Sequence, residues 1–275
     1  MDKYSNQLIT SLQNPRVKDV VKLRKRSDRD EAGLLLIEGY RELKRALDNR
    51  WNPVALFYCR ELFQGTNEDD LIERCCAGGA EILECTDPVF RKMAYRDRPD
   101  GLLALAPQVK RSLGDLQMGP SPLLIVAESI EKPGNLGTML RSADAAGVDA
   151  VVVCDPCTDV NNPNVVRAST GTLFTVPLVE TTSEEALAWL KKNGIQIVAA
   201  TPHTTVEYTD IDLTRGTAFV MGTEQYGLSE LWMKQADQQV RIPMLGQADS
   251  LNVAAATTIL LYEAVRQRRK TKTEA

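Results

Sequence analysis

Apolar runs alternate with amphipathic stretches along the first hundred residues of the chain. Runs of apolar residues predict short strands, and apolar residues spaced three or four apart predict helices. We expect strands at 34–39, 53–59, 81–84 and 101–107, and helices from Pro15 onward, over 40–49 and 68–77, and after Thr86. This alternation predicts a small α/β domain over residues 1–107.

The remainder of the chain repeats the alternation with more strongly apolar strands. We expect strands at 122–129, 150–154, 172–179, 196–200, 217–222 and 239–244, and helices over 135–147, 184–192 and 251–267. Strands that are apolar along their whole length imply a parallel sheet covered on both faces, whose ligands lie beyond the carboxyl ends of the strands. Residues 108–121 carry Gly, Pro and charge without a clear period. They predict a linker before a second domain at 122–275.

Composition excludes several classes of protein. With 43% hydrophobic and 25% charged residues the chain is neither disordered, collagen-like nor a coiled coil. The longest stretch without a charge is 193–206, shorter than the roughly 18 to 20 residues that cross a membrane. No secretory signal is visible at the start. We therefore expect a cytoplasmic protein without a membrane segment.

The six cysteines do not form a disulfide framework, so reduced thiols are expected. Cys154 and Cys157 form a CxxC pair, which leaves a redox pair or half of a zinc site as alternatives. Zinc would need two more ligands, and the chain has one histidine. Cys154 also closes an apolar run, where small buried thiols are common.

The net charge of -4 conceals two basic segments. Residues 14–29 hold seven basic against two acidic residues, and 264–275 hold five against one. An acidic body with basic ends suits a polyanion that contacts part of the surface, although solvated helix faces would give the same pattern. The candidate polyanion-binding residues are Arg16, Lys18, Lys22, Arg24, Lys25 and Arg26.

Three segments of the second domain carry candidate chemistry. The first, 132–147, enters a helix through Gly134 and Gly137 and places Arg141 on it. It lacks the GxGxxG fingerprint, which leaves a nicotinamide-binding site with Asp155 as its ribose acid only a distant alternative. The chain also has no phosphate-loop motif of the nucleotide triphosphatases.

The other two segments resemble the first in their layout. Residues 219–230 are an apolar strand followed by Gly222, Glu224 and Gly227, and a simple strand-to-helix turn would explain the glycines but not the acid. Residues 241–268 begin with Arg-Ile-Pro-Met and place Ser250 and Asn252 at the start of a long helix. A purely structural alternative is that both side chains cap this helix and have no catalytic role.

In this order and spacing, the three segments resemble the motifs of the SpoU (TrmH-like) family of RNA 2'-O-ribose methyltransferases, part of the SPOUT superfamily. Those motifs are Asn-x-Gly-x-x-x-Arg, Gly-x-Glu-x-x-Gly, and Ile-Pro-Met followed by Ser-Leu-Asn. The stretch 167–177 between the first two is also similar to the family. The segments 14–18 and 36–41 resemble the substrate-binding extension of its two-domain members, which act on ribosomal RNA.

The resemblance implies a fold, a cofactor and an assembly. The fold would be a parallel-sheet SPOUT domain with a deep C-terminal trefoil knot, preceded by a small α/β domain like ribosomal protein L30e. The protein would form a homodimer. S-adenosylmethionine would bind around Gly222, Ile242 and Leu251, with Thr201 as a weaker candidate, since adenine prefers apolar walls and backbone hydrogen bonds.

The resemblance also assigns catalytic residues. Methyl transfer requires the ribose hydroxyl to lose its proton, and His203 would be the ordinary base, but it lies outside every motif. The resemblance implies Arg141 instead, as an unusual base or as a cation that orients phosphate and stabilises the forming alkoxide. The family's remaining polar positions are Asn135, Glu224, Ser250 and Asn252. No metal is expected, because a sulfonium already carries a good leaving group.

The expected substrate is RNA, because only RNA has the 2'-hydroxyl, and specifically 23S ribosomal RNA, because the two-domain form resembles the ribosomal enzymes. A transfer RNA enzyme and an antibiotic-resistance ribosomal RNA methyltransferase are alternatives within the family. An inert RNA-binding assembly factor is an alternative from another class. The target nucleotide does not follow from the sequence.

Overall fold

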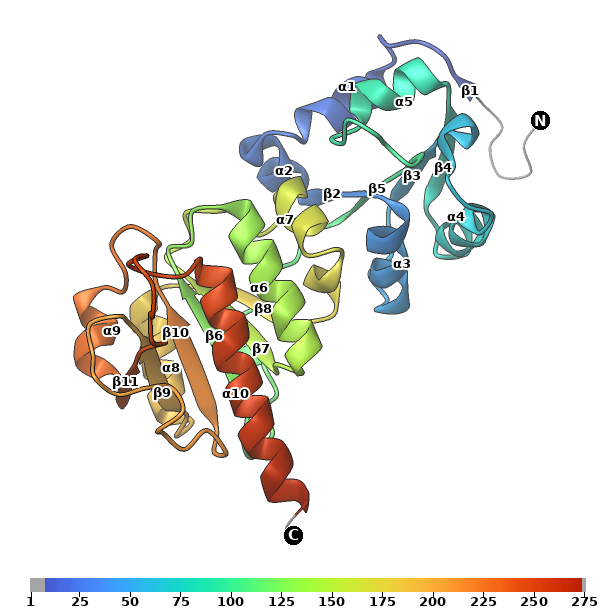
Figure 1. Ribbon diagram of the computed structural model, residues 1–275. Helices are drawn as coiled ribbons and strands as arrows, with labels where there is room; N and C mark the ends of the chain where they lie inside the picture. The colour runs from blue at the N-terminus through green and yellow to red at the C-terminus, as the bar shows by residue number, and fades with distance from the viewer. Residues whose placement is uncertain (1–7, 274–275) are drawn as a thin grey trace. The chain divides into compact units, whose positions relative to one another are not determined.

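The computed structural model describes residues 8–273, which fall into two compact units (Figure 1). The first unit comprises the chain up to Val109 together with Asp159–Thr175. The second unit comprises Lys110–Thr158 and the residues from Val176 onward. Within the described residues, no helix is long and apolar enough to cross a membrane.

The first unit is a mixed sheet with helices on both faces. Its described strands are β1 (Leu8–Ile9), β2 (Leu34–Glu38), β3 (Ala55–Tyr58), β4 (Glu81–Cys85) and β5 (Leu102–Pro107), in the order β1-β4-β3-β5-β2. Its helices are α1 (Pro15–Lys22), α2 (Arg26–Ala32), α3 (Tyr40–Asp48), α4 (Glu68–Ala77), α5 (Asp87–Met93) and α7 (Pro163–Ala168). Strand β5 pairs antiparallel with β2 and β3, while β4 pairs parallel with β1 and β3. The expected small α/β unit is therefore confirmed, with α4 at the predicted residues.

One face of this sheet is buried under α1 and α5. Val17 and Val20 from α1 and Phe90 from α5 are fully buried against Phe57 of β3, so the amphipathic basic stretch contributes its apolar side to the core. Helix α3 packs on β2 and β5, and helix α4 packs on β3 and β4. The cations of α1 consequently lie on its outer side.

The segment Asp159–Thr175 lies between two strands of the second unit in sequence but packs within the first unit. Asp159 forms an ion pair with Arg29, and both side chains are buried, 8% and 2% exposed. The Asn161 side chain accepts a hydrogen bond from the backbone N–H of Val109 at 2.8 Å. The predicted division at residues 108–121 does not include the packing of Asp159–Thr175 in the first unit, because apolar periodicity does not show which neighbour a segment packs against. That division stays a prediction.

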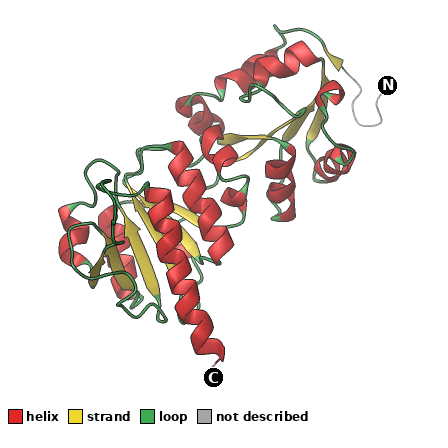
Figure 2. Ribbon diagram, in the orientation of Figure 1, coloured by secondary structure: helices red, strands yellow, loops and turns green. Residues whose placement is uncertain are grey.

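The second unit contains a sheet whose pairings are all parallel, which confirms the predicted parallel sheet. Its described strands are β6 (Leu123–Glu128), β7 (Ala150–Cys154), β8 (Leu178–Thr181), β9 (Gln196–Ala200), β10 (Thr217–Met221) and β11 (Gln238–Val240), in the order β11-β9-β10-β6-β7-β8. Its helices are α6 (Pro133–Ala146), α8 (Ser183–Lys192), α9 (Glu230–Gln235) and α10 (Val253–Thr273). Figure 2 shows the helices on both faces of this sheet.

Alternate residues of the strands serve the two faces, as period-two side chains require. Leu124, Val126 and Val220 pack in the core with Leu190 of α8 and Trp232 of α9. Helices α6 and α10 lie side by side, and Ser142 of α6 shares a 2.7 Å hydrogen bond with Thr258 of α10 (Figure 1). The first segment with candidate chemistry is therefore fixed to the third.

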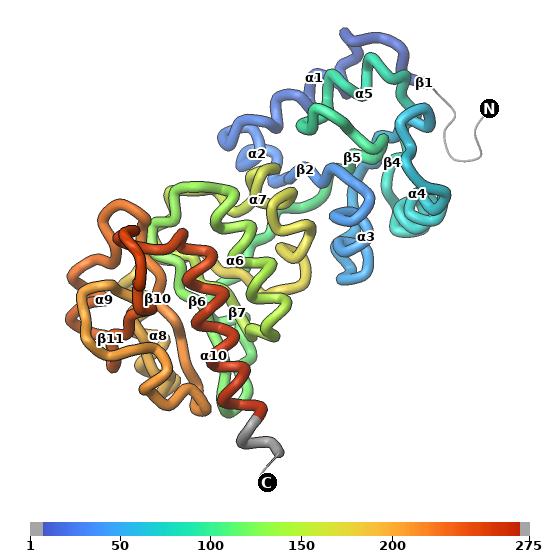
Figure 3. Tube along the Cα trace, in the orientation of Figure 1, coloured from blue at the N-terminus to red at the C-terminus, as the bar shows by residue number. Residues whose placement is uncertain are grey.

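Two expected strands are shorter than predicted. The apolar run 172–179 begins as the 3-10 helix Thr172–Phe174, and only Leu178–Thr181 forms β8, because Gly171 turns the chain at a φ of +85° and the run is divided between the two units. The run 239–244 forms a strand only to Val240, and Pro243 lacks the N–H that a longer ladder would need. Figure 3 traces the loop that follows, from β11 to α10. The trefoil knot stays a prediction.

The buried ion pair of Arg29 and Asp159 yields a stability prediction. Arg29→Ala leaves the Asp159 carboxylate buried without its cation, which we expect to cost about 3–5 kcal/mol of unfolding free energy. The matched control is Arg26→Ala, whose pair with Asp30 is about half exposed and should change stability by about 0.5 kcal/mol or less. Urea unfolding of both variants measures the difference. Equal midpoints would show that the pair does not hold the segment in the first unit.

Candidate active site

Three side chains from the three motif segments meet at one oxygen atom in the second unit. Asn135 of α6 and Asn252, just before α10, each donate a side-chain hydrogen bond to Oε1 of Glu224 at 2.8 Å. Asn252 also donates to the Asn135 side-chain oxygen at 3.1 Å. Glu224 follows β10, so these residues gather at the carboxyl end of a parallel strand. Parallel α/β sheets bind their ligands at this end.

A lysine that the sequence analysis did not single out completes this cluster. Lys132, at the start of α6, donates to the second carboxylate oxygen of Glu224. The hydrogen bonds from Lys132 and Asn135, and the nearby backbone N–H of Val253, lower the pKa of the Glu224 carboxyl below its usual range. Lys132 lies three residues before the first motif begins at Asn135, so its only sequence signal is its place at the start of the segment 132–147. We refer to Lys132, Asn135, Glu224 and Asn252 as the polar cluster.

Asn252 also caps helix α10. Its side-chain oxygen accepts the backbone N–H of Ala254 at 3.0 Å, and its backbone oxygen accepts that of Ala256 at 2.9 Å. The side-chain oxygen of Asn252 therefore caps the helix, as the structural alternative predicts, while its side-chain nitrogen takes part in the polar cluster. Ser250 is exposed and has no hydrogen-bond partner among the described residues. The structure thus does not bring Ser250 into the cluster.

Arg141 lies on the same helix as Asn135 but outside the cluster. It is six residues further along, about 9 Å along the helix axis. Its side chain is exposed and has no hydrogen-bond or ion-pair partner among residues 8–269. An exposed guanidinium without a partner among the described residues is available to an anionic ligand. The catalytic roles of Arg141 and the cluster stay predictions.

The predicted cofactor residues lie at the ends of three neighbouring strands. Thr201 follows β9, Gly222 follows β10 and Ile242 follows β11, and these strands are adjacent in the sheet. Thr201 and Gly222 are buried, Ile242 is half-buried, and Leu251 is 37% exposed. The site therefore offers backbone and apolar walls, which suits a ligand that combines an adenine ring with polar atoms.

Gly222 begins a tight turn that only glycine allows. A Cβ atom at this position would lie 2.3 Å from the backbone oxygen of Gly227, far inside contact distance. The turn is closed by two backbone hydrogen bonds between Thr223 and Gly227, at 3.0 and 3.1 Å. It projects Glu224 toward α6 and α10. Glycine at position 222 is therefore required by this tight turn, whereas an ordinary strand-to-helix turn would accept other residues there.

A buried carboxylate fixes the far end of the same turn. Glu128, at the end of β6 and 5% exposed, accepts the backbone N–H of Ser229 at 2.9 Å. It also accepts the hydroxyl of Ser183 at 3.4 Å, and that hydroxyl accepts the indole N–H of Trp232. Glu128 is not predicted from the sequence, because an acidic residue at the end of an apolar strand does not indicate which groups it will bind in the fold.

Two alternatives from the sequence receive no geometric support. His203 is exposed in the loop after β9, and its side chain has no partner among the described residues. Cys154 is buried at the end of β7, where burial raises the pKa of its thiol, whereas Cys157 is exposed. A buried thiol with a raised pKa is a poor nucleophile and a poor metal ligand.

The first unit uses several of the predicted RNA-binding cations for its own structure. Arg16 pairs with Glu81 at 2.9 Å, Lys22 with Asp19 at 2.9 Å, and Arg26 with Asp30 at 3.5 Å. Arg24 donates to the backbone oxygens of Lys92 and Ala94 at the end of α5, at 3.0 and 2.7 Å, which suits the negative end of a helix. Lys18 and Lys25 are exposed without partners among the described residues. The basic count of the sequence thus overstates the charge available to RNA.

A parallel sheet with a polar cluster at its carboxyl end is the arrangement of an α/β enzyme. The SpoU rRNA methylase family model matches residues 122–262, and the MRM3-like substrate binding domain matches residues 14–104. The chain belongs to the SpoU rRNA methylase family.

Relatives match over most of both chains. The 23S rRNA (uridine(2479)-2'-O)-methyltransferase of Streptomyces viridochromogenes is 33% identical over 88% of this chain and 86% of its own. The 23S rRNA (guanosine(2553)-2'-O)-methyltransferase of Bacillus subtilis is 28% identical over 92% and 97%. The S-adenosylmethionine-bound rRNA methyltransferase from Sinorhizobium meliloti superposes with a TM-score of 0.87 at 32% identity, over 94% and 97% of the two chains.

The lowered pKa of Glu224 predicts a specific dependence of stability on pH. Its ionised form is favoured in the folded state, so its contribution is present above the unfolded pKa, about 4.3, and is lost as the pH falls through the lower folded pKa. In Glu224→Gln the melting midpoint should therefore fall less between pH 6 and pH 3 than in the wild type. The effect should be modest, because the side chain is 30% exposed.

The matched control for this measurement is Glu131→Gln. Glu131 is an exposed carboxylate that precedes Lys132 in the chain. The side chain of Glu131 has no hydrogen-bond or ion-pair partner among the described residues. It should follow the wild-type pH profile. If Glu224→Gln also follows it, the polar cluster does not form in solution.

Proposed function

We propose that the protein transfers a methyl group from S-adenosylmethionine to a ribose 2'-hydroxyl of large-subunit ribosomal RNA. The observation that carries the proposal is the polar cluster, in which Asn135, Glu224 and Asn252 join the three family motifs through one carboxylate oxygen. An exposed Arg141 lies on the same helix as Asn135. Family membership, a structural relative with S-adenosylmethionine bound and two relatives named as 23S rRNA 2'-O-methyltransferases support the same reaction.

The residues at the strand ends fit the cofactor. The adenine moiety would lie against backbone at Gly222 and Ile242 and against the apolar side chain of Leu251, with Thr201 at the neighbouring strand end. The tight turn at Gly222 leaves no room for a Cβ atom, so a substituent there would break the wall. When bound, S-adenosylmethionine supplies an electrophilic methyl group on a sulfonium.

Arg141 is assigned to the ribose hydroxyl. Two roles fit its unpaired side chain: it takes the proton of the 2'-hydroxyl with help from the neighbouring RNA phosphate, or it remains a cation that holds the phosphate and stabilises the forming alkoxide. Asn135, Glu224 and Asn252 hold the two helices and the turn around this position, and Ser250 lies exposed in the same loop as Leu251. No step calls for a metal.

Ribosomal RNA is favoured over the other substrates. Two relatives that match most of both chains are named for 23S rRNA, which supports ribosomal RNA over transfer RNA. An intact polar cluster argues against an inert assembly factor. Because the substrate is ribosomal RNA, we place the protein in the cytoplasm.

We also propose a homodimer formed by the second unit. Tyr226 and Leu245, in the two loops that carry the cofactor residues, are 78% and 98% exposed, and Leu251 is 37% exposed. Large apolar side chains gathered in loops beside a ligand site favour coverage by a second protein surface.

Methyl transfer to isolated RNA tests the function. Tritiated S-adenosylmethionine is incubated with ribosomal and transfer RNA from a strain that lacks the protein, and the RNA is then digested to nucleosides. We expect label in one 2'-O-methylnucleoside of 23S rRNA. Label in transfer RNA alone would replace the substrate, and no label in either RNA would contradict the proposed activity.

Arg141→Ala should lower kcat at least about 100-fold, because both roles of Arg141 act on the forming alkoxide. Its affinity for S-adenosylmethionine, measured by calorimetry, should not change. Arg215→Ala removes another cation of the second unit, at a position outside the motifs, and is the matched control. An Arg141→Ala enzyme that keeps most of its rate would contradict both roles.

A further inference from the structure

The first unit contains a cavity of about 410 Å³ near the N-terminal ends of α3 and α4. This volume lies inside the range of roughly 300–1,000 Å³ that is usual for small-molecule sites. All its lining residues belong to the first unit. They are Tyr40, Arg41, Glu42, Gln64, Gly65, Asn67, Glu68, Arg96, Asp100 and Thr170.

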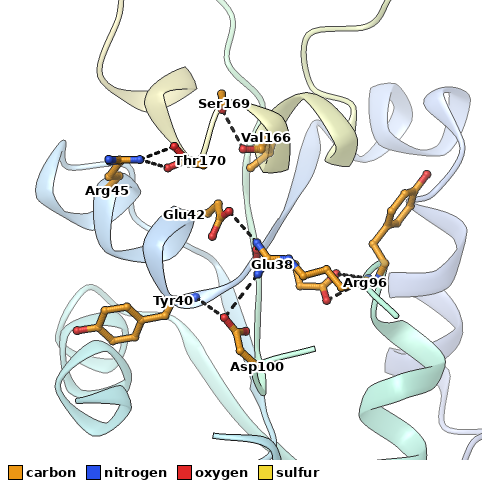
Figure 4. A network of polar contacts seen from close by, with 10 residues as sticks. Glu38, Tyr40, Glu42, Arg45, Arg96, Asp100, Val166, Ser169 and Thr170 are labelled. Carbon is orange, nitrogen blue, oxygen red and sulfur yellow. Dashed lines mark hydrogen bonds and ion pairs between the residues drawn. The ribbon is translucent and has the colours of Figure 1, made fainter. Parts of the chain in front are cut away.

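The floor of the cavity is a fixed arrangement of charged groups around Arg96 (Figure 4). The Arg96 guanidinium donates to Glu42 at 2.7 Å and to the backbone oxygen of Glu38 at 2.9 Å, and it lies 3.6 Å from Asp100. Gly39 makes this packing possible, because a Cβ atom there would lie 2.6 Å from the Arg96 guanidinium. The floor is therefore built into the fold.

Each acidic group of the cavity has at least one partner, but the buried Oδ1 of Asp100 accepts no hydrogen bond from the described residues. Asp100 accepts the backbone N–H of Tyr40 at 2.9 Å, and Glu68 accepts that of Gly65 at 2.8 Å, so each carboxylate satisfies backbone donors close to the start of a helix. Glu42 is paired with Arg96. The lining holds three carboxylates and two guanidinium groups, of which only Arg96 is paired with the carboxylates. The carboxylates disfavour a phosphate beside them and favour a neutral group that carries N–H donors.

The outer lining offers groups that are not engaged. The side chains of Tyr40, Arg41, Gln64 and Asn67 have no hydrogen-bond or ion-pair partner among residues 8–269. In Figure 4 the ring of Tyr40 points away from Asp100 and Arg96. The lining thus combines one aromatic ring, two amides that both donate and accept, and one exposed guanidinium.

These groups match the parts of a single nucleotide. Unpaired RNA bases stack on aromatic rings and form hydrogen bonds along their edges, and a guanidinium binds phosphate. Here Tyr40 supplies the ring, Gln64 and Asn67 supply edge contacts, and Arg41 supplies the cation at the rim.

We propose that this cavity binds one unpaired nucleotide of the RNA substrate, with its base inside beside Tyr40 and its phosphate at Arg41. The inference rests on the proposed function, because it takes RNA as the substrate. The match of residues 14–104 to a substrate-binding domain covers every lining residue except Thr170.

The cavity adds an RNA contact of the first unit to the exposed Lys18 and Lys25 of the basic stretch 14–29. In the basic stretch 14–29, Arg16, Lys22 and Arg26 are paired with acids, Arg24 caps a helix, and Arg29 is buried. Arg41 is exposed and unpaired within the described part of the chain. Exposed cations attract the RNA phosphates irrespective of sequence. A cavity that holds a base would in addition recognise one particular nucleotide.

Filter binding of a 23S rRNA transcript tests the cavity without requiring turnover. Tyr40→Ala should weaken RNA binding about 5- to 150-fold, the range for loss of one stacked base, while Tyr40→Phe, which keeps the ring, should bind nearly as the wild type does. Arg41→Ala should reduce the slope of log affinity against log salt by about 0.7, as the loss of one phosphate contact requires. Arg50→Ala removes an exposed arginine just beyond the opposite end of α3 and should leave the slope unchanged.

Photo-crosslinking provides a second readout should a variant fold poorly. Wild-type protein is irradiated with a transcript that contains 4-thiouridine, and the crosslinked peptides are mapped. Crosslinks at 40–41 and 64–67 support the proposal. Crosslinks confined to other segments, or a Tyr40→Ala protein that melts and binds RNA as the wild type does, overturn it.

The result is separable from the proposed function. If the wild type binds and methylates RNA while Tyr40→Ala and Arg41→Ala bind RNA with unchanged affinity, only the proposed role of the cavity is overturned. Absence of methyl transfer by the wild type would overturn the proposed function, and the binding measurements would still test the cavity.

Discussion

The carboxylate of Glu224 is the group on which the candidate active site depends. It connects residues that are 89 and 28 positions away in sequence, Asn135 and Asn252, through hydrogen bonds of 2.8 Å. Hydrogen bonds to an ionised acceptor are stronger than those between neutral groups. The glycine turn at Gly222 aims the carboxylate, and buried Glu128 holds the other end of that turn. The side chain of Arg141 has no partner within the described residues, which leaves it available for the role proposed for it.

The first unit depends on a different constraint, the segment Asp159–Thr175. This segment leaves the parallel sheet after β7, supplies the acid that neutralises buried Arg29, and returns to form β8. Thr170 from the same segment accepts a hydrogen bond from Arg45 of α3 and lines the cavity of the first unit. The two units are therefore not encoded by two separable pieces of chain. A cut at residues 108–121 would leave Arg29 buried without its partner.

Much of this organisation follows from the sequence, and the exceptions have physical reasons. Apolar runs and helical periodicity predict the parallel sheet and α4, because burial dictates both patterns. Of the polar positions that the resemblance implies, the structure brings Asn135, Glu224 and Asn252 together and leaves Ser250 outside, and their catalytic roles stay predictions. A count of basic residues does not reveal that Arg24 caps α5 or that Arg29 is buried, since charge patterns do not identify partners. The strand predicted at 172–179 is wrong in its first half, because the run is divided between the two units.

A double-mutant cycle on the affinity for S-adenosylmethionine tests the central claim most directly. Calorimetry would compare wild type, Asn135→Ala, Glu224→Ala and the double variant. If the polar cluster holds the cofactor loops as one unit, each single variant weakens binding and the double variant binds little worse than the weaker single variant. The coupling free energy should then be about 0.5–3 kcal/mol. Additive losses, or no loss in either single variant, would contradict the account.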